Sequence, residues 1–220
     1  MSELWEILRR FFPEFAAGFL VTCQIVGIAF LVAMVVGTLV ASLRIAPVKV
    51  LNWIGGLYVE TFRNIPLLVL LFISYAGFRR GGFPIAPMVA ATGSLGLYTA
   101  AYVAEAIRSG VFAVGRGQIE AALSLGFSYP ATMRKIILPQ AIRTVIPPIG
   151  NLTIAMIKNS AIVGVSLALA DDLMKQARLI NSSTFKTNET FFWAGVGYLL
   201  LTVTATFIVR HLETRLTIKR

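Results

Sequence analysis

Lys158 is the residue of this chain best suited to bind a small charged solute. It stands beside Asn159 and Ser160 in the segment MIKNSAIVGVSL, well inside an apolar run that should form a helix. An ammonium group at membrane depth costs about 2.5 to 3.5 kcal/mol on insertion scales, so it normally faces a cavity or a partner. Its charge could bind a substrate carboxylate, and the neighbouring amide and hydroxyl could complete the recognition of an amino acid. The alternative is a lysine that snorkels outward or pairs with a carboxylate in the membrane.

Arg63, Asn64 and Glu105 form a second group of candidates for a solute pathway. Glu60 precedes Arg63 by three residues, and Glu105 precedes Arg108 by the same spacing. Residues three apart lie on one face of a helix, so each pair could form an ion pair. We therefore take structural pairing as the first interpretation of these charges and substrate contact as the second.

The residue patterns of common catalytic sites are absent from the sequence. No GxxxxGK[ST] segment occurs, so the chain cannot hydrolyse ATP by that route, and the energy for any active process must come from a partner. His211 is the single histidine and Cys23 the single cysteine, and neither HExxH nor a nucleophile elbow occurs. We therefore assign no catalytic residue and no metal-binding residue.

The composition places these residues in a membrane protein. The chain is 57% hydrophobic with a mean hydropathy of +0.78, and several windows exceed the roughly 20 apolar residues that a bilayer demands of a helix. A net charge of +10 would suggest nucleic acid in a soluble chain. Here the basic residues lie between apolar spans, where they set orientation and meet anionic lipid. The lipid bilayer is therefore an expected partner, and nucleic acid is not.

Five transmembrane helices are predicted, in an all-α protein with one membrane domain over residues 1–220. The predicted spans are 16–43, 57–78, 85–106, 142–170 and 191–209. An odd number of spans puts the two termini on opposite sides. The segments on one side, including 115–140, hold eleven Lys and Arg residues against seven on the other, which favours the first side as cytoplasmic. The N-terminus is then outside, where residues 2–15 suit a short interfacial helix, with a frayed terminus as the alternative.

Local patterns inside the spans predict close packing and two bends. Two stripes of small residues recur at every fourth position and should let helix backbones approach. The stripes are Ala29, Ala33, Gly37 and Ala41 in the first span and Thr92, Gly96, Ala100 and Ala104 in the third. Pro66 removes a backbone donor and biases Ile65 away from the helical region, so a kink is expected there, and another bend at Pro147-Pro148.

The polar stretch 115–140 predicts a compact knob between two spans. One short helix is expected over 118–125, with Gly126 as its C-terminal cap, and a second over 131–137, ended by Leu138-Pro139. The tip of such a knob would hold Glu120, Ala122 and Leu123. It could insert into a cleft of a cytoplasmic partner and carry that partner's motion to the spans as a rigid body. An ordinary surface loop is the alternative.

The same stretch resembles the coupling loop of permease subunits of binding-protein-dependent ABC importers. Its pattern is Glu-Ala-Ala, three residues, Gly, nine residues, Ile, one residue and Leu-Pro. The matching residues are Glu120, Ala121, Ala122, Gly126, Ile136, Leu138 and Pro139. The segments LYVETFRNIPLLVL, AEAIRSGV, ILPQAIRTVIPP and MIKNSAI resemble the polar amino-acid branch of that family, and the likeness extends from about Val21 to Leu212.

The resemblance implies a type I ABC importer permease fold in a bacterial inner membrane. It implies two cytoplasmic ATPase subunits that bind ATP and Mg, with no cofactor in this chain, and an external solute-binding protein. It also implies a dimer, formed with a second copy or with a paralogous subunit. Glutamate, aspartate or glutamine is the expected substrate, moved by alternating access. Two other classes stay open from the residues alone: a self-contained channel or secondary carrier, and a non-transporting membrane anchor for a cytoplasmic partner.

Overall fold

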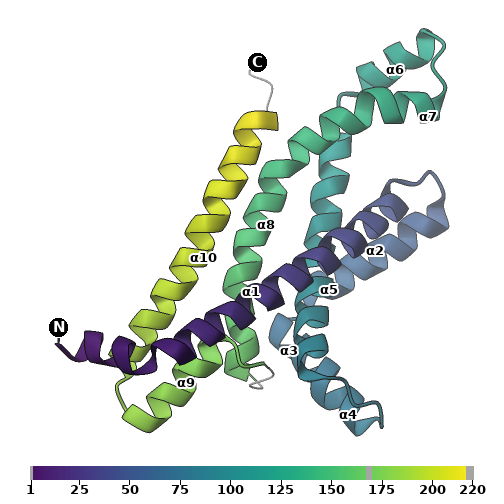
Figure 1. The fold of residues 1–220 in the computed structure, drawn as a ribbon. Coiled ribbons are helices and arrows are strands. Elements are labelled where there is room, and N and C mark those ends of the chain that lie inside the picture. Colours follow the sequence, from purple (N-terminus) through teal and green to yellow (C-terminus); the bar gives the residue numbers. More distant parts are fainter. Residues whose placement is uncertain (1, 167–169, 217–220) are drawn as a thin grey trace.

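The computed structural model describes residues 2–166 and 170–216, and within them the backbone is helical without strands, which confirms the all-α prediction. Figure 1 shows the N-terminus at the end of the long helices where α9 lies, and the C-terminus at the opposite end, with α6 and α7. The elements are α1 (Ser2–Ile45), α2 (Lys49–Asn64), α3 (Leu67–Phe72), η1 (Ile73–Gly77), α4 (Phe78–Arg80), α5 (Pro87–Phe112), α6 (Arg116–Ser124), α7 (Tyr129–Thr132), η2 (Met133–Ile137), α8 (Leu138–Ser166), α9 (Leu173–Thr184) and α10 (Thr187–Leu216).

The N-terminal segment forms a short helical stretch of its own, which is joined to the first long helix across a kink at Phe11. Helix α1 runs from Ser2 to Ile45 and is interrupted only at Phe11, whose φ of −116° and ψ of 20° are not helical. Pro13 follows two residues later, and a proline inside a helix removes a hydrogen bond and strains the preceding turn. The segment is anchored, since Trp193 Nε1 donates a 2.8 Å hydrogen bond to the Leu4 carbonyl. The alternative prediction of a frayed N-terminus is therefore wrong.

The second predicted span is not one helix. It begins earlier than expected, at Lys49, and breaks between Asn64 and Leu67 with a bend of 100° between α2 and the helical segment that ends at Arg80. Ile65 is extended, with φ −95° and ψ 128°, as expected for a residue before proline. The kink predicted at Pro66 is confirmed, and it is far sharper than a bend within one helix.

Helix α5 lies at the centre of the bundle and packs mainly against α1. The two small-residue stripes face each other there. A Cβ added at Gly37 would lie 2.7 Å from Val103 of α5, and one added at Gly96 would lie 2.7 Å from Val32 of α1. The stripes therefore pack α1 and α5 of the same subunit together, as ordinary bundle packing requires. Helix α5 covers most of the third predicted span, 85–106: it begins two residues later, at Pro87, and ends six residues further on, at Phe112.

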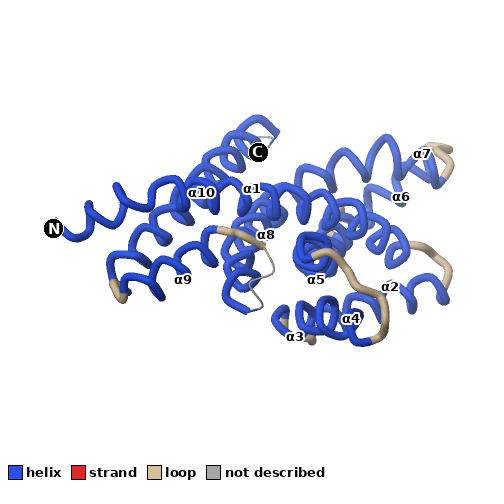
Figure 2. The backbone as a smooth tube through the Cα atoms, turned by 60° about the horizontal axis from the view of Figure 1, so that its bottom comes forward, coloured by secondary structure: helices blue, strands red, loops and turns tan. Residues whose placement is uncertain are grey.

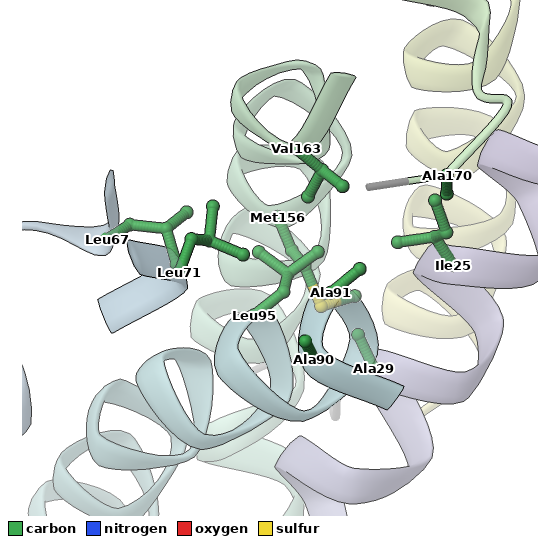
Figure 3. Packing of buried hydrophobic residues seen from close by; sticks show 10 residues of the cluster. All are labelled: Ile25, Ala29, Leu67, Leu71, Ala90, Ala91, Leu95, Met156, Val163 and Ala170. Carbon is green, nitrogen blue, oxygen red and sulfur yellow. The ribbon is translucent and has the colours of Figure 1, made fainter. Parts of the chain in front are cut away.

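One buried apolar cluster joins four of the helices. Figure 3 shows residues from α1, α3, α5 and α8 meeting side by side. They include Ile25 of α1, Leu71 of α3, Leu95 of α5 and Met156 of α8, which are fully buried or nearly so. Burying such side chains contributes roughly 1.5–3 kcal/mol each in water, and in lipid the same contacts act through close packing. The prediction of a single domain over 1–220 stays a prediction.

The last two predicted spans begin earlier than expected. The fourth predicted span corresponds to α8, which begins at Leu138 and remains helical through Pro147 and Pro148. Its predicted end at 170 lies beyond residues 167–169, which are outside the described part. The fifth, α10, exceeds its predicted range at both ends. Between them lies α9, which was not predicted. Two features of the sequence could have predicted α9: Asp172 as its N-cap and the helical spacing of the apolar residues Leu173, Ala177 and Ile180. All four residues are buried.

By length and composition, three helices of the described structure can cross a membrane. They are Glu3–Ile45, Tyr129–Ser166 and Thr187–Arg215, and a fourth is added if α2 and the bent segment after it form one span. Helix α5 is not among them, because glycine, serine and threonine residues lower its hydropathy. Its neighbours bury much of it. Both views place α6 and α7 far from α9, at opposite ends of the long helices (Figures 1 and 2).

Candidate functional site

A cavity of ≈ 330 Å³ with both polar and apolar walls brings together two of the predicted pathway residues. Arg63 reaches it from α2 and Glu105 from α5, while Thr144, Pro148 and Leu152 of α8 close the opposite wall. The guanidinium carbon of Arg63 lies 5.4 Å from the centre of the Tyr102 ring, which is cation–π distance. The volume is at the lower end of the roughly 300–1,000 Å³ typical of small-molecule pockets. The cavity therefore has the size and polarity for a small solute.

Glu105 is held by two arginines at the edge of this cavity. Arg108 Nη2 lies 2.5 Å from Glu105 Oε1, which confirms the pair predicted from the spacing on α5. Arg44 of α1 forms a second ion pair with the other carboxylate oxygen. Arg44 is 61 residues away in the chain, so only tertiary structure could reveal this contact. With Arg63 near it, one carboxylate faces three guanidinium groups, and the site keeps a positive charge.

The predicted Glu60–Arg63 ion pair is wrong. Arg63 packs over Tyr102, and no ion pair joins it to Glu60 in the part of the chain that the structure describes. Asn64 lies at the end of α2, where its Nδ2 donates a 2.7 Å hydrogen bond to the Glu60 carbonyl. Asn64 does not line the cavity. Of the second-rank candidates, the fold therefore brings Arg63 and Glu105 together and leaves Asn64 outside.

The Lys158 segment lies on α8, beyond the end of the cavity. Lys158 is exposed on the isolated chain and forms no ion pair with any residue that the structure describes. Asn159 is half-buried and lies seven residues after Leu152, so the two share a face about 10 Å apart along the axis. Ser160 is fully buried, and its Oγ donates a 2.7 Å hydrogen bond to the Ile157 carbonyl. In this conformation Ser160 does not reach the cavity.

A buried polar cluster surrounds Asp172 and was not predicted from the sequence. Asp172 Oδ1 accepts a 2.8 Å hydrogen bond from the Lys175 amide and so caps α9, and Thr22 of α1 accepts one of 3.1 Å from the Leu173 amide. The Gly164 backbone also approaches the carboxylate. Burial raises the pKa of Asp172 to about 6, although the backbone amides of Lys175, Gly164 and Met174 oppose the shift. The cluster joins α1, α8 and α9.

The knob predicted from the polar stretch is present, and its glycine cap is confirmed. Helix α6 ends at Ser124, and Gly126 follows with φ +84°, a conformation that L side chains rarely adopt. The Gly126 amide donates to the Leu123 carbonyl at 3.0 Å, and the Phe127 amide donates to the Ala122 carbonyl at 3.1 Å. This is the hydrogen-bond pattern of a Schellman motif. The turn is therefore fixed by the backbone and needs no side chain.

The second half of the knob differs from the prediction. The helix begins at Tyr129 and does not end at Leu138-Pro139, because α7, the π-helical turn η2 and α8 follow one another without a break. The wider π turn at Met133–Ile137 ends two residues before Pro139, which lacks a backbone donor and would clash within a regular helix. The π turn thus lets the knob continue into a long helix. A movement of the knob would act directly on α8.

The end of α6 exposes apolar side chains beside one acid, while Arg134 and Lys135 are exposed on the second half of the knob. Leu125 is 79% exposed and Leu123 44% exposed, and Glu120 lies on the surface near them. Ala122, expected near the tip, is only 2% exposed and faces the interior of the knob. The remaining motif residues are Ala121, Ile136, Leu138 and Pro139, of which Ile136 packs on the small core beneath and the other three are exposed. An exposed apolar patch on a projecting element is typical of a protein interface.

A cavity among membrane helices and a capped knob at one end are features that this chain shares with a known family. A family model described as the binding-protein-dependent transport system inner membrane component matches residues 14–218. The chain belongs to this family. The match includes the whole of the knob and every element from the later part of α1 to α10, so it extends beyond the likeness from Val21 to Leu212.

Curated relatives cover almost the full length of this family member. It is 44% identical over 211 residues to the probable glutamine ABC transporter permease protein GlnM of Bacillus subtilis, covering 96% of this chain and 97% of that protein. It is 36% identical to the glutamate transport system permease protein GluC of Corynebacterium glutamicum, with both chains fully covered. The arginine transport system permease protein ArtQ of Bacillus subtilis is 35% identical over 205 residues, 93% of each chain.

Solved structures share the fold of this family member. A chain in a crystal structure of an amino acid ABC transporter with histidines superposes with a TM-score of 0.88 and 34% identity, covering 94% of this chain and 96% of that one. An inward-facing MetNI methionine ABC transporter gives a TM-score of 0.70 at 20% identity, which is a likeness of fold. The chain is thus a permease component of an ABC importer in a bacterial inner membrane, with several membrane-crossing helices.

Proposed function

We propose that this chain carries a polar amino acid, with glutamine or glutamate preferred, through the membrane as the permease of an ATP-driven importer. The observation that carries the substrate class is the cavity where Arg63 and Glu105 meet. An amino acid bears a carboxylate, and the cavity wall offers the guanidinium of Arg63 in a small volume that keeps a positive charge. The names of the relatives for glutamine and glutamate support the same class.

Lys158 and Asn159 extend this site along α8. Asn159 lies on the face of α8 that closes the cavity, and Lys158 stands exposed beside it without an ion pair in the described chain. An ammonium group without a charged partner at membrane depth is costly in free energy, and a substrate carboxylate would lower that cost. We assign Arg63, Glu105, Lys158 and Asn159 to the pathway. Ser160 and Asn64 act through packing and helix capping near it.

The knob is proposed as the contact with a cytoplasmic ATPase dimer, which would bind ATP and Mg. Leu123, Leu125 and Glu120 form the exposed contact surface, while Ala122 packs inside and Gly126 fixes the turn. Because the knob continues through η2 into α8, movement at its tip would reach the helix that carries Lys158. This gives a direct mechanical route from ATP hydrolysis to the pathway.

Topology and assembly follow from the same proposal. Helix α1, the bent α2–α4 unit, α5, α8 and α10 run alternately between the two ends of the molecule (Figure 1), which supports five crossings. With the knob on the cytoplasmic side, the C-terminus is cytoplasmic and the N-terminus is outside, where an external solute-binding protein would deliver substrate. The pathway face of α8 is exposed in the single chain, which supports a dimer with a second copy or a paralogous subunit.

Uptake into proteoliposomes tests the proposal. The protein is reconstituted with its partner ATPase, with the binding protein outside and ATP inside, and challenged with labelled glutamine, glutamate, aspartate and arginine. We expect uptake of glutamine or glutamate that requires both ATP and the binding protein. Uptake that needs neither would show a channel or carrier instead. Absence of flux with this chain alone, restored by a paralogous permease, would show that the transporter is a heterodimer.

A further inference from the structure

Two neighbouring side chains each bury a polar atom that has no hydrogen-bond partner among the described residues. These atoms are Oδ2 of Asp172, at the start of α9, and the hydroxyl oxygen of Tyr198 on α10. Asp172 is fully buried, and its other carboxylate oxygen caps α9. Helix α9 packs against α1, α8 and α10 and lies beside the N-terminal parts of α1 and α10 in Figure 1. A buried polar atom without a partner is costly in free energy, so both atoms should form a hydrogen bond in some arrangement of these helices.

The Tyr198 hydroxyl lies near oxygen atoms from three other elements. They belong to the Asp172 carboxylate at the start of α9, to Ser160 on α8 and to Thr22 on α1. Ser160 and Thr22 each donate their own proton to a carbonyl of their helix, at 2.7 and 3.0 Å, so toward Tyr198 they can only accept. An ionised carboxylate also only accepts. The phenol O–H is therefore one donor with three possible acceptors in different elements.

Among these acceptors the Asp172 carboxylate is the strongest at neutral pH. Burial raises the pKa of Asp172 to about 6, so the carboxylate is still mostly ionised at pH 7 and would accept a charge-assisted hydrogen bond. Cations of α9 do not satisfy it in the described chain. Lys175 forms its ion pair with Asp171 at 2.6 Å and acts on Asp172 only weakly, and Arg178 donates to two carbonyls at the end of α8 at 3.1 and 2.6 Å. From α1, α8 and α10, the described groups that approach the carboxylate are the uncharged hydroxyls and backbone named above.

We propose that Tyr198 is a positioning residue whose hydroxyl has two alternative sets of partners. Bonded to Asp172, it ties α10 to the start of α9. Bonded to Ser160 or Thr22, it ties α10 to α8 or α1. In this structure it bonds to none of the three, so it lies between the two arrangements. An element with two discrete arrangements can support an alternating movement of helices.

The choice of partner acts on the part of α8 that carries Lys158. Ser160 follows Lys158 by two residues, which places the two side chains on nearly opposite faces of the helix. Ser160 is fully buried, whereas Lys158 is exposed. A bond from Tyr198 to Ser160 would therefore hold the helix from the face opposite Lys158. This inference rests on the proposed function, because it gives the pathway residues of α8 a contact that can hold or release them.

Infrared titration of the purified full-length protein in detergent tests the bond to Asp172 without any transport. The carbonyl band of the protonated Asp172 carboxyl is identified by its loss in Asp172→Asn. Tyr198→Phe removes only the hydroxyl. Because a donor to the ionised carboxylate lowers its pKa, Tyr198→Phe should titrate about one pH unit higher, which is a ten-fold tighter binding of the proton. Thr206→Val removes a hydroxyl that donates to its own helix α10 at 2.7 Å, and it should titrate as the wild type does. An unchanged or lower midpoint in Tyr198→Phe would overturn the proposal.

ATP-driven uptake into proteoliposomes tests the positioning role. Tyr198→Phe should lower the kcat of uptake at least about five-fold, the effect of one hydrogen bond, and change KM less. In the Asp172→Asn background the same substitution should have a smaller effect, because the two residues act through one bond. Thermal unfolding of each variant shows that the fold persists. A normal kcat in Tyr198→Phe, or equal effects in the two backgrounds, would refute the positioning role. Absence of uptake by the wild-type protein would count against the proposed function, and the infrared titration would still confirm or refute the bond.

Discussion

A Cβ atom on Gly164 of α8 would lie 2.0 Å from Oδ1 of Asp172, so glycine is required where the buried carboxylate meets the helix. The same oxygen caps α9 through the Lys175 amide. The end of α8 and the start of α9 are therefore fixed to one another by an acid that has room only because residue 164 has no side chain.

Gly164→Ala should destabilise the protein. The added methyl group must displace Asp172, which combines overpacking, about 1–3 kcal/mol, with a weakened N-cap, about 0.5–2 kcal/mol. The measurement is the thermal unfolding temperature in detergent. Gly195→Ala is the matched control, because its Cβ would meet nothing within 4 Å and alanine favours the helix. An unfolding temperature unchanged in Gly164→Ala would contradict the contact.

The stability of the wild-type protein should fall as pH rises from about 4 to about 6. The pKa of Asp172 is raised from 3.8 to about 6 in the folded state, so the folded state binds the proton more tightly than the unfolded state. This binding adds to the free energy of unfolding below about pH 4, and the contribution is lost as Asp172 ionises. The change amounts to about 3 kcal/mol at most. Asp172→Asn keeps an N-cap side chain but does not titrate, so its unfolding curves should depend less on pH over this window. Equal pH dependence of the two proteins would disprove the assignment.

Gly126→Val should abolish ATP-driven uptake while leaving membrane insertion intact. Gly126 has φ +84°, and forcing an L residue into that region costs roughly 1–2 kcal/mol, more for a β-branched side chain. Since a Cβ there meets nothing within 4 Å, the effect is on the backbone turn alone. Gly126→Asn should retain more uptake, because asparagine tolerates this conformation. Uptake and the amount of protein in the membrane are both measured, and normal uptake by Gly126→Val would remove the knob from coupling.

Lys158→Ala should raise the apparent KM for the amino acid by about ten-fold or more. A hydrogen bond to a charged group contributes roughly 1.5–3 kcal/mol, and its loss would affect substrate binding before it affects the ATPase cycle. Lys175→Ala is the control, because Lys175 lies on α9 and pairs with Asp171 at 2.6 Å. Concentration-dependent uptake gives the KM of each variant. An unchanged KM in Lys158→Ala would exclude this lysine from the pathway.

Glu105 and Arg108 illustrate what local spacing can predict. Their ion pair follows from three residues of separation on a helix, and the Gly126 cap follows from the turn chemistry of a single glycine. The kink at Pro66 follows from a missing donor and a restricted neighbour. Each of these features depends on atoms within about one helical turn of each other, so the amino-acid order is sufficient.

The contacts that the sequence could not predict join distant segments. Arg44 reaches Glu105 across 61 residues, and Thr22 reaches the Leu173 amide across 151. The inward orientation of Ala122 depended on which face of α6 meets its neighbours, and the continuity of η2 with α8 depended on how the backbone accommodates Pro139.

The sequence by itself therefore determined the membrane class, the helical content, the coupling motif and the local caps, because apolar periodicity and turn chemistry act over a few residues. Only the tertiary structure decided which faces of those helices meet. That choice placed Arg63 and Glu105 at one cavity and left Lys158 without an ion pair among the described residues. Side-chain shape and close packing between helices distant in the chain are properties of the whole fold, and no short window of residues contains them.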